Sequence, residues 1–103
     1  MDRIYFKHGT DVNGTQFTIV GKGEQKQNGT KFSFGVTACS TEDDFNFYEG
    51  RKKAVMFLNE KPYSYVTTGV ELITQDNVQK HLKCFVRKFS KKSIRKFIYE
   101  KRS

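Results

Sequence analysis

Hydrophobic and polar residues alternate along two stretches of the chain, residues 15–23 and 31–39. The large apolar residues of both stretches fall on one face: Phe17, Ile19, Phe32, Phe34 and Val36. Alternation with a period of two predicts half-buried strands. The Asn28-Gly29 pair between the two stretches favours a tight hairpin turn. The pattern therefore predicts an antiparallel β-hairpin, and residues 4–7 and 63–68 predict two further short extended segments.

A helix is predicted over residues 41–60. Ser40 or Thr41 can cap its backbone N–H groups, the three carboxylates that follow suit the positive end of the helix dipole, and Pro62 enforces a stop. A period of 3.6 residues places one broad set of apolar side chains on a common face: Phe45, Tyr48, Val55, Met56 and Leu58.

A further helix is predicted from about Thr74 to Phe89, although residues 82–86 would also fit a strand. One apolar stripe runs along this helix: Val78, Leu82, Phe85, Val86 and Phe89. Ile94, Phe97 and Ile98 are out of phase with that stripe, so the sequence predicts a break near Ser90, where a serine can cap a new short helix.

These elements predict an α+β fold in one domain, residues 1–103. An antiparallel β-hairpin, extended by one or two short strands into a small sheet, packs on the central 41–60 helix, and the basic C-terminal helix or helices lie against the same layer. A length of 103 residues leaves little room for a second domain.

The apolar residues nowhere form a run of the 18–20 needed to span a bilayer. The N-terminal residues lack the charged-then-apolar layout of a signal peptide. We therefore expect no membrane association and a cytoplasmic location, with Cys39 and Cys84 as reduced thiols.

The net charge of +8 is distributed very unevenly. Residues 1–79 hold nine basic and ten acidic side chains, a net charge of −1, whereas residues 80–103 hold ten basic and one acidic, a net charge of +9. The candidate binding residues are the cations of this segment: Lys80, Lys83, Arg87, Lys88, Lys91, Lys92, Arg95 and Lys96. Lys80, Lys83, Arg87 and Lys91 recur every three or four residues and so form one helical ridge that would match a row of phosphates.

Three interpretations of this basic segment remain open. It can contact nucleic acid through phosphates, it can dock on an acidic protein surface, or it can be a solvated face that aids solubility. Two residues of the 41–60 helix are further candidate contacts. Arg51 falls inside the apolar arc, where it would extend outward, pair with a carboxylate or serve a ligand, and Phe57 falls on the polar side.

Metal binding and catalysis find little support in the residue pattern. Of the residues with metal-binding chemistry (His8, Cys39, His81 and Cys84), only His81 and Cys84 have a plausible local spacing, and there is no Cys-x-x-Cys pair. No serine or cysteine stands at an informative spacing from a histidine and a carboxylate. We expect no metal, no cofactor and no enzymatic activity.

The run Gly35–Phe45, GVTACSTEDDF, followed by Gly50–Ala54, GRKKA, resembles small uncharacterised proteins encoded by bacteriophages and prophages. The resemblance spans residues 35–54 and excludes the basic segment. It implies a phage origin and assigns no role to any residue.

The leading functional hypothesis is a non-enzymatic accessory protein of phage type that binds DNA or RNA electrostatically through its C-terminal segment. The alternative is a host-takeover or counter-defence inhibitor, similar in action to an anti-CRISPR protein, that blocks a host protein or its nucleic-acid or nucleotide ligand. Both require a partner that is anionic. The sequence carries no signature of a particular oligomeric state.

Overall fold

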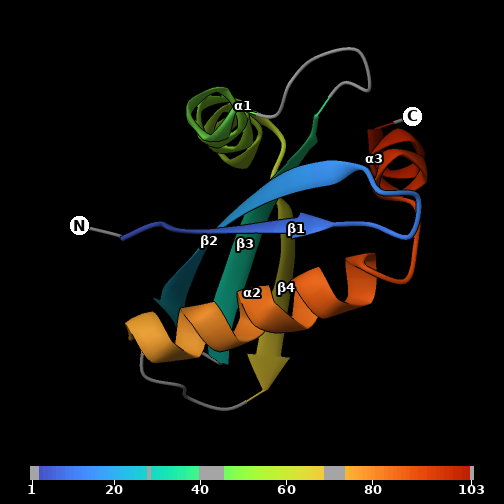
Figure 1. Cartoon of the computed structure of the whole chain (residues 1–103). Helices are drawn as coiled ribbons and strands as arrows, with labels where there is room; N and C mark the ends of the chain where they lie inside the picture. The colour runs from blue at the N-terminus through green and yellow to red at the C-terminus, as the bar shows by residue number, and fades with distance from the viewer. Residues whose placement is uncertain (1–2, 28, 40–45, 69–73, 103) are drawn as a thin grey trace.

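The computed structural model describes residues 3–27, 29–39, 46–68 and 74–102. Its elements, in chain order, are β1 (Tyr5–Thr10), β2 (Gln16–Lys26), β3 (Gly29–Ala38), α1 (Phe47–Glu60), β4 (Tyr63–Thr68), α2 (Gln75–Phe89) and α3 (Ile94–Arg102). The predicted α+β class is confirmed, since the hairpin is extended by two shorter strands and accompanied by helices (Figure 1).

The four strands form one antiparallel sheet in the order β1-β2-β3-β4. The predicted hairpin is its centre, with β2 and β3 paired from Phe17↔Ala38 to Lys26↔Gly29. Asn28, half of the predicted turn pair, lies outside the described residues. Strand β4 pairs with only part of β3. The pairing ends where Tyr63 lies opposite Phe34, and the last four residues of β3 extend beyond this pair.

Helices cover both faces of the sheet, α1 on one side and α2 on the other (Figure 1). The larger core lies on the α2 side and includes the alternating apolar residues of the hairpin: Phe17, Ile19, Phe32, Phe34 and Val36. Helices α2 and α3 complete this core with Val78, Leu82, Phe89 and Ile94. Helix α1 covers the second face of the sheet, so Thr18, Ser33 and Thr37 are buried as well. The alternation of apolar and polar residues alone predicts strands with only one buried face.

The start and the buried face of α1 differ from the sequence prediction. The helix begins at Phe47, and the Asn46 side chain accepts hydrogen bonds from the N–H groups of Tyr48 and Glu49. The predicted caps Ser40 and Thr41 lie outside the described residues. The predicted apolar face is only partly correct: Leu58 is buried and Val55 packs beside it, whereas Tyr48 is 71% exposed and Met56 43% exposed. Phe45 lies outside the described residues, and Ala54 is buried on the packed side instead.

The close approach of α1 to the sheet explains which face it buries. A Cβ atom placed on Gly35 would lie 2.4 Å from the carbonyl oxygen of Ala54 and 2.6 Å from the nitrogen of Leu58. The backbone of α1 at Ala54 therefore lies almost directly on the backbone of β3. This backbone-to-backbone contact selects the 54/58 face over the one with more apolar surface.

Residues 75–89 form a helix throughout, which excludes the strand alternative for residues 82–86. The predicted break is present, but Ser90 ends α2 instead of starting α3: its hydroxyl donates to the carbonyl of Arg87. The hydroxyl of Ser93 accepts from the N–H of Lys96 and thus caps α3. The out-of-phase apolar residues Phe97 and Ile98 pack on the common core, as the break predicts.

Asp11, in the loop between β1 and β2, holds the start of α3. One oxygen of this buried carboxylate accepts from the N–H groups of Asn13 and Thr15, and the other accepts from the N–H of Ile94 at 2.8 Å. Burial raises the pKa of Asp11, but these hydrogen bonds and nearby Arg95 outweigh it, so the pKa lies below its ordinary value. An ionised Asp11 therefore stabilises the docking of α3.

Replacing Asp11 with asparagine is expected to lower the free energy of unfolding at pH 7 by about 2 kcal/mol, because an amide cannot accept from all three N–H groups. The wild-type stabilisation is present above the unfolded-state pKa of about 4 and is lost as the pH falls through the lower folded-state pKa. Urea titrations should therefore show a gap between wild type and Asp11→Asn that narrows below pH 4. A gap that does not change with pH would contradict this role, and Asp76→Asn, at an exposed carboxylate, serves as the control.

Candidate nucleic-acid interface

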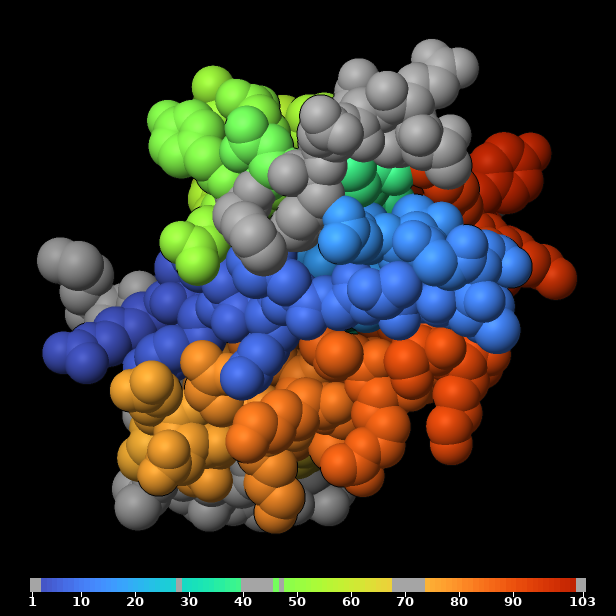
Figure 2. Space-filling model, viewed as in Figure 1, coloured from blue at the N-terminus to red at the C-terminus, as the bar shows by residue number. Residues whose placement is uncertain are grey.

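The cations of α2 project from the side of the helix that faces away from the sheet. Burial of Val78, Leu82 and Phe89 fixes the rotation of the helix, so Lys80, Lys83 and Arg87 are exposed. These three lie at helical steps of three and four residues and span about 10 Å along the axis. Three of the four residues of the predicted ridge are therefore exposed on α2, whereas the fourth, Lys91, lies in the turn after the helix. Figure 2 shows the surface of α2, in orange, along one side of the molecule.

The turn between α2 and α3 continues this basic surface. Lys88, Lys91 and Lys92 are exposed in and beside the turn, and Arg95 and Lys96 are exposed in the first turn of α3. The β1–β2 loop supports the turn, because the N–H of Val12 donates to the carbonyl of Lys92 in addition to the Asp11 contacts. We refer to the exposed cations of α2, the turn and α3 as the basic face: Lys80, Lys83, Arg87, Lys88, Lys91, Lys92, Arg95 and Lys96.

The described part of the chain neutralises little of the positive charge of the basic face, although the Asp11 carboxylate acts on Arg95. The ion pairs recorded between described residues join Glu24 to Lys22 and Lys26, at the far end of the β2–β3 hairpin. None involves a member of the basic face. The like-charged side chains are held close together by the fold, and an anionic partner would relieve their repulsion.

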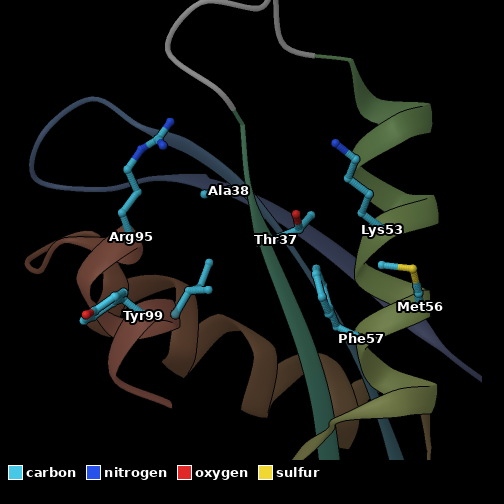
Figure 3. A pocket seen from close by; sticks show the side chains of 8 residues that line it. Thr37, Ala38, Lys53, Met56, Phe57, Arg95 and Tyr99 are labelled. Carbon is cyan, nitrogen blue, oxygen red and sulfur yellow. The ribbon is translucent and has the colours of Figure 1, made fainter. Parts of the chain in front are cut away.

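Arg95 differs from the other members because it also borders a pocket. Its guanidinium donates to the carbonyl oxygen of Cys39, just past the end of β3, over 2.5 Å. The pocket has a volume of about 650 Å³ and lies between α1 and α3, beside the part of β3 that extends beyond β4. We call it the α1–α3 groove, and its described lining is Thr37, Ala38, Lys53, Met56, Phe57, Arg95, Ile98 and Tyr99 (Figure 3).

The two candidate contacts on the 41–60 helix have different surroundings. Phe57 lines the α1–α3 groove, so the fold brings it to the same site as Arg95. Arg51 is exposed, and its guanidinium lies 5.3 Å from the ring centroid of Phe6 on β1. Because α1 covers the opposite face of the sheet from α2, Arg51 does not join the basic face of α2.

The residues considered for metal binding are separated by the sheet. His8 shares a 2.9 Å hydrogen bond with Thr18 on the α1 side, and burial followed by the charge of Arg51 lowers the pKa of His8. His81 lies on α2, stacks on Phe32 and shares a hydrogen bond with the hydroxyl of Tyr65. Within the described ranges, no group of three or more histidine, cysteine, aspartate or glutamate side chains could hold a metal ion.

Sequence reasoning missed most of the α1–α3 groove. Tyr99, which is 74% exposed, carries no local signal of a site, and the helical period places Met56 on the predicted apolar face. Lys53 is one of three consecutive cations, and nothing in the sequence distinguishes it from its neighbours. The groove depends on how far α1 and α3 stand apart across β3, a distance that no local pattern encodes.

No helix in the part of the chain that the structure describes is long and apolar enough to cross a membrane. Comparison of the chain with protein-family models, with curated proteins and with solved structures finds no match.

Proposed function

We propose that the protein binds nucleic acid through the basic face, mainly by contacts to phosphates. The observation that carries the proposal is the exposure of all eight cations on two consecutive helices and their turn, without an ion pair among the described residues. Lysine and arginine side chains arranged in this way neutralise phosphates and release the counterions condensed around them. We infer neither an enzymatic activity nor a cofactor.

The arrangement of the basic face favours recognition of the backbone over reading of base edges. The α2 ridge is made of Lys80, Lys83 and Arg87, and the neighbouring exposed position is Cys84. Asparagine and glutamine, which pair with adenine edges, are absent from its outer surface between residues 80 and 89. Phosphate contacts of this kind position a protein on nucleic acid with little dependence on sequence.

Affinity for nucleic acid is expected to fall steeply with salt. If about five of the eight cations contact phosphates of duplex DNA, a plot of log affinity against log salt concentration has a slope of about −4.5, which is a loss of about 500-fold between 50 and 200 mM. Fluorescence anisotropy with labelled duplex and single-stranded DNA and RNA measures this slope for each nucleic acid. Binding that does not change with salt, or no binding at low salt, would contradict the proposal.

A second proposal follows from the resemblance to phage-encoded proteins: a host-takeover or counter-defence protein that docks the same basic face on an acidic host protein. Exposed Tyr99, on the same helix as Arg95 and Lys96, is a side chain of the kind that protein interfaces use. Affinity capture from host lysate treated with nuclease separates the two proposals. A stoichiometric protein partner that survives nuclease treatment and is lost when the basic face is reversed in charge favours the second.

A further inference from the structure

We propose that the α1–α3 groove holds an unpaired nucleotide of single-stranded nucleic acid, with the base against the apolar walls and a backbone phosphate between Lys53 and Arg95. This inference rests on the proposed function and makes it specific. It predicts that the protein distinguishes single strands from duplexes, which the basic face alone would not do.

The walls of the groove offer the surfaces on which bases stack. Phe57 and Met56 line it from α1 and Ala38 from β3, while Tyr99, from α3, lines its edge with the ring directed away from α1 (Figure 3). The volume of about 650 Å³ falls within the range of pockets that enclose a small organic ligand. Every base has an aromatic face, so stacking on such walls is strong and tolerates any sequence.

The charges of the groove select an anion. Lys53 and Arg95 stand on its opposite walls, and Figure 3 shows both charged ends toward the same end of the pocket, on either side of β3. They are the charged members of its described lining. The hydrogen bond from Arg95 to the carbonyl of Cys39 holds the guanidinium in place before a ligand arrives.

Arg95 belongs both to the basic face and to the lining of the groove. We infer that a strand whose phosphates contact the turn between α2 and α3 places its next nucleotide in the groove beside Arg95. The base it places there must be unstacked and unpaired, because a base within a duplex is enclosed by its neighbours. This requirement makes a single strand the occupant that fits best.

The test compares two double variants that are matched in chemistry. Lys53→Gln with Tyr99→Ser removes one cation and one aromatic ring of the groove. Lys52→Gln with Tyr48→Ser removes the same groups outside its described lining, since Lys52 is also exposed and Tyr48 is 71% exposed against 74% for Tyr99. All four side chains are exposed, so neither variant opens the core.

Affinities of the wild type and both variants for an oligothymidylate and for duplex DNA are measured by anisotropy. We expect the groove variant to bind the single strand at least about tenfold more weakly, while its affinity for the duplex and both affinities of the matched variant change less than about twofold. Equal single-strand affinities of the groove variant and the matched variant would overturn the inference. The proposed function is judged separately, because it fails only if the wild type binds neither nucleic acid in the same measurements.

The methyl group of Met56 reports occupancy of the groove directly. In protein labelled with ¹³C at the methionine methyl groups, its resonance should shift when oligothymidylate is added and stay in place with duplex DNA. The aromatic ring current of a stacked base is the expected cause of the shift. A shift produced by an acidic peptide and not by oligothymidylate would overturn the inference in favour of a protein ligand.

Discussion

Replacing Lys83, Arg87 and Lys91 with glutamate is expected to weaken nucleic-acid binding by at least about a thousandfold. In 0.1 M salt each phosphate contact contributes roughly tenfold to affinity through counterion release. Loss of three contacts accounts for most of the expected change, and repulsion between the new carboxylates and the phosphates adds to it. Gel shifts or anisotropy with single-stranded and duplex DNA measure the loss.

A second triple variant separates the basic face from the overall charge. Arg3, Lys52 and Lys61 are exposed cations outside that face, and their replacement with glutamate changes the net charge by the same six units. This control is expected to lose less than about tenfold in affinity, because each of its charges lies away from the α2 ridge. Equal losses in the two variants would mean that net charge alone governs binding, and circular dichroism checks that both variants remain folded.

Replacing Gly35 with alanine is expected to destabilise the fold by about 3 kcal/mol. The new Cβ would meet two backbone atoms of α1, the Ala54 oxygen at 2.4 Å and the Leu58 nitrogen at 2.6 Å. Backbone atoms cannot rotate away as a side chain can, so α1 must move off the sheet and lose part of its packing on Val20. Against a typical total stability of about 5–15 kcal/mol, this change is large.

Thermal unfolding followed by circular dichroism should show a midpoint lowered by about 15 °C for Gly35→Ala. The control is Gly14→Ala, where φ is +78° and no atom lies within 4 Å of the added Cβ. The free energy of unfolding of that variant is expected to fall by only about 1 kcal/mol, which is the cost of holding an alanine in a left-handed conformation. If Gly35→Ala were no less stable than Gly14→Ala, α1 would not rest on β3 as closely as described.

The β-hairpin was predictable because each of its strands carries its own signal. Phe17 and Ile19 alternate with polar residues, as do Phe32 and Phe34, and their partners lie nearby in sequence. Helix α1 was harder, because its wheel contains more apolar surface on the Tyr48 side than on the side that packs. The close contact of Ala54 with Gly35, nineteen residues earlier, decided its orientation.

The candidate interface also has a part that the sequence predicts and a part that it does not. Exposure of Lys80, Lys83 and Arg87 follows from the helical period of the apolar stripe, which the sequence displays. Phe57 was recognised as lying off the predicted apolar face, but its neighbours across the groove, Tyr99 and Arg95, are about forty residues away in the chain. Sequence periodicity describes one element at a time and carries no information about the spacing between two.

By itself, the sequence determined the α+β class, the central hairpin and the concentration of positive charge in residues 80–103, because each depends on neighbours within a few residues. Only the tertiary structure decided that α1 and α2 cover opposite faces of the sheet, that buried Asp11 holds the start of α3, and that a groove separates α1 from α3. These features arise from close packing between distant segments. Gly35 lacks a Cβ atom and so lets α1 approach the sheet closely. One carboxylate oxygen of Asp11 accepts a hydrogen bond from Ile94 and so positions the start of α3.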